Sequence, residues 1–175
     1  MSVALPPDFD AAFFRTALGR FATGVTVVTA LSPDGTPVGL TVSSFNSVSL
    51  DPPLILWSLS RNSSSLATFE HCDHYVVNVL SCDQIPLARR FARGKMPERF
   101  ADLTPVRAPG GTLMLDAPCA AWFECHNRSR YVEGDHVIMI GQVEHCGHSG
   151  APPLVFHAGG FDLTPDGKKT DPASS

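Results

Sequence analysis

Most hydrophobic runs in this chain are short, rich in β-branched residues and bounded by turn-forming residues, which is the pattern of β-strands. The runs expected to form strands are 25–31, 37–48, 54–60, 74–80, 120–127, 136–146 and 154–157. Residues 32–36, Ser-Pro-Asp-Gly-Thr, have turn chemistry, so the first two strands are expected to form a hairpin. Residues 128–135 are expected to separate the two strands that flank them.

Three segments carry helix signals instead. Phe14, Leu18 and Phe21 recur at i, i+4 and i+7 on one face, after aspartates that can cap the helix. A short helix with serines at its start is expected over 63–70, and the capping-box spacing of 81–84 predicts a third helix. The helices are inserted between strands without regular βαβ alternation, which favours an antiparallel barrel over a doubly wound parallel sheet.

The size and composition of the chain indicate one domain that associates with a second copy. Its 175 residues are close to the usual size of a domain, and one domain is expected over 8–164, with flexible termini at 1–7 and 165–175. Hydrophobic residues make up 43% of the chain and charged residues only 17%. More apolar surface is therefore expected than a lone monomer exposes, which predicts a homodimer.

The charge pattern favours small-molecule ligands over nucleic acid or membranes. The net charge is −4, and no basic run is interleaved with aromatic residues. The N-terminal region lacks the pattern of a secretory signal, and no apolar run approaches the ~20 residues of a membrane span. Five scattered cysteines without a CxxC pair suit reduced thiols, so a cytoplasmic protein is expected.

A hydroxyl-rich block over 39–66 carries the strongest chemical signal in the chain. Residues 41–44 offer small hydroxyl groups and backbone amides to a planar group, and 58–65 offer serines together with Arg61 to an anionic group. A flavin mononucleotide, with a polar planar ring and an anionic tail, matches this profile. A solvated strand face followed by ordinary helix-capping serines is the alternative interpretation.

The sequence Gly-x-Thr-x-Ser-Ser-Phe-x-Ser-Val-Ser-Leu-x-Pro-Pro-Leu at 39–54 resembles the signature of the short-chain flavin reductases. These proteins are the reductase components of two-component flavin-dependent monooxygenases. Further similar motifs lie at 14–29, 91–100, 134–136 and 153–156. The resemblance implies a mainly β fold, the FMN-binding split barrel, which is an antiparallel split β-barrel with short flanking helices.

The resemblance also implies which residues bind the cofactor. The flavin ring would lie along Thr41, Val42, Ser43 and Ser44, and the ribityl chain and phosphate along Ser58, Leu59, Ser60 and Ser65. The loop over the phosphate end would comprise Phe91, Ala92, Arg93, Arg99 and Phe100. Basic residues at a helix end also serve simply as caps, which is the alternative for this loop.

His136 matches the family histidine beside the nicotinamide pocket, where it would orient the hydride donor. A purely structural hydrogen bond with the preceding Asp135 is the alternative. No GxGxxG motif follows a strand, so a dinucleotide is expected to bind without a Rossmann crevice. Residues 156–161 lack the Arg or Lys and the Tyr that many relatives carry, which leaves the choice between NADH and NADPH open.

The function implied is that of an NAD(P)H:flavin oxidoreductase. Such a protein transfers hydride from NADH or NADPH to FMN or FAD and supplies reduced flavin to a partner monooxygenase. Two alternatives remain: a flavoredoxin-like FMN-binding electron-transfer protein that oxidises no nicotinamide, and a split-barrel haem protein.

No metal site is expected. Cys125-His126 and His145-Cys146-x-His148 contain side chains of the ligand type, but their spacing fits no standard zinc motif. Neighbouring residues on a strand point to opposite faces, so too few ligands would meet on either face.

Overall fold

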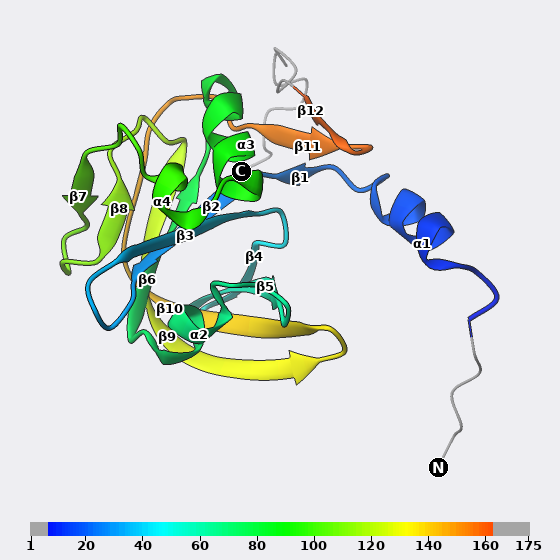
Figure 1. Ribbon diagram of the computed structural model, residues 1–175, viewed down its shortest axis with the longest axis horizontal. Helices are drawn as coiled ribbons and strands as arrows, with labels where there is room; N and C mark the ends of the chain where they lie inside the picture. The colour runs from blue at the N-terminus through cyan, green and yellow to red at the C-terminus, as the bar shows by residue number, and fades with distance from the viewer. Residues whose placement is uncertain (1–6, 163–175) are drawn as a thin grey trace, which may run out of the picture.

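The computed structural model describes residues 7–162. The flexible termini expected at 1–7 and 165–175 lie outside this range, apart from Pro7. Strands dominate the described residues, and short helices lie between them (Figure 1). The protein is therefore mainly β with antiparallel pairing, as the sequence predicts.

The largest sheet has seven strands in the order β3-β2-β6-β9-β10-β5-β4. These are β2 (Thr26–Leu31), β3 (Pro37–Val42), β4 (Asn46–Leu50), β5 (Pro53–Ser60), β6 (His74–Val79), β9 (Ala121–Glu133) and β10 (His136–His148). Every neighbouring pair is antiparallel. Strands β3 and β4 form opposite edges although only residues 43–45 separate them, so the sheet curls until its edges approach each other (Figure 1).

The remaining elements flank this sheet. Strands β1 (Thr23–Gly24), β11 (Val155–His157) and β12 (Gly160–Asp162) form a small sheet, and β7 (Pro105–Arg107) pairs with β8 (Leu113–Leu115). The helices are α1 (Ala11–Leu18), α2 (Leu66–His71), α3 (Ile85–Arg93) and α4 (Met96–Arg99), with a 3-10 turn at Cys82–Gln84. Helices α3 and α4 both contact β3, so they support the strand that begins the hydroxyl-rich block.

Buried side chains form two clusters, one on each face of the large sheet. Val27 and Val28 are neighbours on β2 and belong to different clusters, because successive residues of a strand point to opposite faces. In one cluster the ring of Trp57 packs edge-on against Phe69 and Tyr75, with centroids 5.0 and 5.6 Å apart. The other cluster extends to α3.

Several local predictions are confirmed. Strands β2 and β3 form the expected hairpin, and the turn contains Gly35, whose φ of 83° is one that glycine adopts readily. The N–H of Gly35 donates to the carbonyl of Ser32 at 2.8 Å. The capping box is present as well, because the N–H of Ser81 donates to Oε1 of Gln84 at 2.8 Å.

Other boundaries differ from the prediction. The strand expected over 37–48 ends at Val42, because the chain leaves one sheet edge there and starts the other edge at β4. The expected separation over 128–135 is wrong: β9 and β10 form one long hairpin that turns at Gly134, where φ is 60°. The helix expected over 63–70 starts only at Leu66. Strands β7, β8 and β12 were not predicted, because three residues are too few to show a period.

Helix α1 stands away from the large sheet and has no buried side chain (Figure 1). Oδ1 of Asp10 accepts the N–H of Phe13 at 2.8 Å, which confirms the capped start. Its apolar side chains remain open to solvent, with Phe13 67% and Leu18 58% exposed. The apolar face predicted from the sequence therefore lacks a covering element within the described residues. Among those residues, no helix combines the length and apolar character needed to cross a membrane.

Candidate functional site

A cavity of about 350 Å³ lies where the end of β3, the end of β5 and the start of β10 meet. Its lining residues are Leu40, Thr41, Val42, Ser43, Ser44, Ser58, Leu59, Ser60, Ser63 and His136. The structure thus brings together the predicted ring-binding residues, most of the predicted ribityl-binding residues and the predicted catalytic histidine. Leu40 and Ser63 are additional lining residues, and both belong to the hydroxyl-rich block.

Strand register explains why distant segments converge here. Strand β10 pairs with β5 so that His136 lies opposite Ser60 and Ile138 opposite Ser58. Directly opposite residues project from the same face of a sheet, and so do residues two apart on one strand. His136, Ser58 and Ser60 consequently share the face that borders the cavity, while Trp57, which precedes Ser58 on β5, is fully buried in the core.

The side chain of Ser44 ties the segment 43–45 to β5. Its Oγ accepts the N–H of Ser58 at 2.8 Å and donates to the carbonyl of Ser58 at 3.3 Å. The hydroxyl of Ser44 is therefore occupied by the chain itself. By contrast, the hydroxyls of Ser43 and Ser58 make no hydrogen bond to the other described residues, so they can meet a ligand.

Thr41 is held from the opposite side. Its Oγ1 donates to the carbonyl of Ala88 in α3 at 2.7 Å. The hydroxyl proton is thus committed to α3, and only the oxygen lone pairs remain for the polar rim of a ligand. The sequence identified Thr41 as a ring contact but gave no sign of this second bond.

His136 has one ring nitrogen fixed and one free. Its Nδ1 lies 2.7 Å from Oδ1 of Asp135, and a carboxylate only accepts, so Nδ1 carries the proton. The hydrogen bond from His136, followed by its charge, lowers the pKa of the Asp135 carboxyl below its usual value. Nε2 has no partner among the described residues and can accept a hydrogen bond, or donate one when the ring is charged.

Phe91, Phe100 and Arg99 support β3 from behind instead of lining the cavity. Phe91 is fully buried and meets Phe100 edge-on, and a Cβ at Gly39 would lie only 2.8 Å from the Phe91 ring. Arg99 donates to the carbonyls of Gly39 at 2.6 Å and Gly94 at 2.8 Å. Burial lowers the pKa of Arg99 from its usual value, and these two carbonyls engage much of its guanidinium.

The other predicted contacts also lie away from this cavity. Ala92 and Arg93 border a separate cavity of about 490 Å³, next to Phe156 and Phe161. Ser65 precedes α2 and is 1% exposed, and its Oγ is buried without a hydrogen-bond partner in the described structure.

A neighbouring cavity of about 460 Å³ shares Ser43 with the first one. Arg15, Arg20 and Phe21 line it from α1 and the turn after it, and Phe156 lines it from β11. The sequence drew attention to the missing cation after the last strand, and here two arginines from the N-terminal region lie beside that strand. No motif marks these arginines, so sequence reasoning missed them.

The residues present fit a flavin nucleotide. A cavity of 350 Å³ is within the usual size of a small-molecule site. Ser43 and Ser58 provide hydroxyls without protein partners, and the buried, unpartnered Oγ1 of Thr23 opens the same possibility in the adjoining cavity. Ring nitrogens and carbonyls of an isoalloxazine, together with an anionic tail, would use such groups and the nearby arginines.

The fold and the cavity together define a class: a curled antiparallel sheet with a cavity of about 350 Å³ that is lined by several hydroxyl groups. Comparison with known proteins agrees. Residues 18–164 match the family described as flavin reductase like domain, and the chain belongs to that family.

Two curated relatives and one solved structure illustrate the similarity. The chain is 43% identical over 159 residues to FMN reductase (NADH) SmoA of Agrobacterium fabrum, covering 91% of this chain and 89% of that protein. It is 42% identical to the stachydrine N-demethylase reductase subunit Stc3 of Rhizobium meliloti, covering 87% of this chain and 66% of that protein. The structure of NADH:FAD oxidoreductase SgcE6 of Streptomyces globisporus C-1027, in complex with NAD and FAD fragments, has a TM-score of 0.82 at 30% identity, covering 94% of this chain and 99% of that one.

Proposed function

We propose that this protein is an NAD(P)H-dependent flavin reductase that transfers hydride from NADH or NADPH to FMN or FAD and supplies the reduced flavin to a partner monooxygenase. The observation that carries the proposal is the convergence of 41–44, 58–60 and His136 on one cavity. The names of two relatives, an NADH-dependent FMN reductase and a reductase subunit of a demethylase, support flavin reduction by a nicotinamide and a role as the reductase part of a larger system.

The fold that we propose for this function is the split barrel of the family, formed by one domain over 8–164. Two observations support a barrel that is split between β3 and β5. Residues 43–45 join the two edge strands, and the hydroxyl of Ser44 is hydrogen-bonded to the backbone of Ser58 on β5. The exposed apolar face of α1 supports a homodimer. All five cysteines are unpaired, which is in keeping with the reducing environment of the cytoplasm.

A bound flavin would supply the hydride-accepting chemistry, and the chain would supply position. The backbone of 41–44 and the hydroxyls of Ser43 and Ser58 would orient the ring and its side chain. His136 would hold the nicotinamide amide through Nε2, since hydride transfer depends mainly on distance and alignment. It needs no role as a base.

An electron carrier that binds FMN without oxidising a nicotinamide would need neither the free Nε2 of His136 nor an open cavity beside it. The position of His136 in the lining therefore favours the reductase.

Stopped-flow absorbance tests the proposal directly. Purified protein is mixed with each nicotinamide and each flavin, and the NADH and flavin bands are followed together. We expect oxidation of at least one nicotinamide that depends on added flavin. Flavin binding without any nicotinamide oxidation would replace the reductase by the carrier, and absence of flavin binding would reject both.

A further inference from the structure

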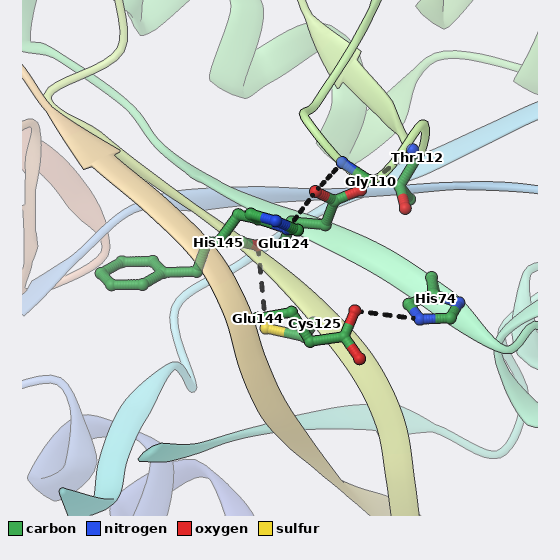
Figure 2. Close-up of polar contacts among 8 residues, drawn as sticks. His74, Gly110, Thr112, Glu124, Cys125, Glu144 and His145 are labelled. Carbon is green, nitrogen blue, oxygen red and sulfur yellow. Dashed lines mark hydrogen bonds and ion pairs between the residues drawn. The ribbon is translucent and has the colours of Figure 1, made fainter.

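A second group of polar side chains gathers away from the cavity, on the face of the large sheet opposite Trp57 and Tyr75, which is called the outer face below. It consists of His74 on β6, His126 on β9 and Glu144 on β10. Nε2 of His74 lies 3.1 Å from Oε2 of Glu144, and the rings of His74 and His126 have centroids 5.4 Å apart. One potential ligand atom from each residue lies within 4.8 Å of the other two. Figure 2 shows His74 and Glu144 directed toward each other from β6 and β10, the two strands that flank β9.

The register of three strands produces this grouping. His74 lies directly opposite His126 across β6 and β9, so both rings project from the same face. Strand β10 has an irregularity between Val143 and His145, at which Glu144 has no partner on β9. A β-bulge of this kind adds one residue and re-aims its side chain.

The bulge also explains why strict alternation along β10 does not predict the faces on which Glu144 and His145 lie. Val143 lies opposite Cys125, whose side chain is fully buried in the core, so a regular strand would turn His145 toward the core as well. Instead His145 lies opposite Glu124, and both His145 and Glu144 reach the outer face. The sequence argument against a metal rested on ligand spacing and on strict alternation, and it did not include His74, which comes from a third strand.

The carboxylate of the adjacent Glu124 is engaged by the chain itself, and the group comprises only His74, His126 and Glu144 among the described residues. The Glu124 carboxylate accepts the N–H groups of Gly110 at 2.7 Å and Thr112 at 3.0 Å, and lies 3.0 Å from Nδ1 of His145 (Figure 2). Burial opposes its ionisation, but the hydrogen bonds from Thr112 and Gly110 and the nearby His145 prevail and lower the pKa of Glu124.

We propose that His74, His126 and Glu144 bind a zinc ion. Two imidazoles and one carboxylate are a ligand set that zinc uses with water in the fourth position, and zinc imposes no strict geometry of its own. Ligand distances of 2.0–2.2 Å place tetrahedral ligand atoms about 3.3–3.6 Å apart. The His74–Glu144 distance of 3.1 Å is slightly shorter than this spacing, and His126 is exposed, so small side-chain rotations complete the site.

This zinc site is separate from the flavin chemistry. His136 and Glu144 both lie on β10, eight positions apart, which corresponds to about 27 Å at the usual rise of a strand. The ion would link β6, β9 and β10 on their outer face. Because it binds only the folded chain, zinc is expected to raise thermal stability and to leave flavin reduction unchanged.

Direct metal binding tests the proposal. Full-length protein without a histidine tag is stripped with a chelator, and zinc is titrated against a chromophoric chelator. We expect one equivalent with micromolar or tighter affinity, together with a rise in melting temperature. In the variants His126→Ala and Glu144→Gln, the affinity should fall about ten-fold or more and the rise should disappear.

The matched control is His148→Ala, which removes an exposed histidine from the same strand outside the group. It should bind zinc as the unmodified protein does. Circular dichroism verifies that every variant is folded. Flavin reductase turnover is measured separately and tests the proposed function, so its absence would leave the result of the zinc titration valid. Absence of stoichiometric binding, equal binding by His126→Ala, or equal loss in His148→Ala would overturn the proposal.

Discussion

At the scale of single residues, His136 shows how a side chain is prepared for a ligand by its neighbour. Asp135 is largely exposed, yet its carboxylate fixes the proton of His136 on Nδ1 and so defines what Nε2 can do. The structural hydrogen bond between Asp135 and His136 is therefore compatible with the proposed role of His136. Nδ1 makes this hydrogen bond, and Nε2 remains available for the ligand.

Replacing His136 by Ala should slow flavin-dependent NADH or NADPH oxidation by about ten- to a hundred-fold, because the donor loses its alignment with the flavin. Flavin affinity should stay nearly unchanged, because 41–44 and 58–60 still line the cavity. Stopped-flow rates and flavin fluorescence titration separate the two effects. The variant His148→Ala serves as control, and a loss of flavin binding in His136→Ala would contradict the proposed role.

Gly141 illustrates a residue fixed by close packing. A Cβ at this position would lie 2.3 Å from Oη of Tyr75 and 3.0 Å from Cβ of Cys125. Burial raises the pKa of Tyr75 well above its usual value, and its hydroxyl has no hydrogen-bond partner in the described structure. The hydroxyl thus contributes a steric constraint without a compensating bond.

The change Gly141→Ala should therefore lower the free energy of unfolding by about 1–3 kcal/mol. Tyr75→Phe alone should change it by less than about 1 kcal/mol, because the removed hydroxyl is unsatisfied. In the double variant part of the cost of Gly141→Ala should be recovered, which urea denaturation of all four proteins measures. Strict additivity of the two changes would show that the hydroxyl is not the obstacle.

At the scale of elements, the sequence predicted strand and turn positions better than strand ends. The β2–β3 hairpin and the capping box at 81–84 depend on local chemistry and are found as expected. The break at Val42 depends on which edge of the sheet the next strand joins, and hydrophobic period carries no such information. The same reason explains the continuous β9–β10 hairpin.

The candidate site divides in the same way. Residues 41–44, 58–60 and His136 could be assigned from motifs in strands, and the structure gathers them in one cavity. Phe91 and Arg99 belong to the same family motif but lie behind β3, and their packing and hydrogen bonds emerge only in three dimensions. The sequence did not reveal the grouping of His74, His126 and Glu144, because a bulge and the pairing of three strands bring these residues together.

The segment 43–45 provides a prediction about one element. Ser44→Ala leaves the N–H and carbonyl of Ser58 without their partner, which should cost about 1–2 kcal/mol of stability and weaken flavin binding. Ser43→Ala removes an exposed hydroxyl with no bond to the described chain, so it should weaken flavin binding while stability stays the same. Urea denaturation and flavin titration of both variants check this prediction. Equal stability of the two variants would show that the hydrogen bonds between Ser44 and Ser58 do not stabilise the protein.

At the scale of the whole molecule, the apolar surface is concentrated on α1 and the turn that follows. Phe13, Leu18 and Phe21 are each more than half exposed, and α1 contributes no buried side chain to the chain's own core. The cavity that contains Arg15 and Arg20 lies next to this surface. A second copy that covers α1 would therefore also complete the wall of that cavity.

The change Leu18→Asp should shift the protein from dimer to monomer, because it places a charge within the proposed interface. The fold of the single chain should be unaffected, since Leu18 is 58% exposed. Analytical ultracentrifugation gives the oligomeric state, and Ala67→Asp, at an exposed position of α2, is the control that should remain dimeric. A monomeric unmodified protein, or a dimeric Leu18→Asp variant, would contradict the proposed homodimer.

Residues 43–45 connect the two edges of the large sheet, and Ser43 and Ser44 also border the cavity. A nucleotide bound there would contact the ends of both β3 and β5 and would restrict the motion of these strand ends relative to each other. Amide hydrogen exchange along β3 and β4 should then slow down when flavin is added, while exchange in β6 and β9 stays constant. Release of the reduced flavin would restore the motion of β3 and β4, so the local stability of these strands would rise and fall once in each turnover.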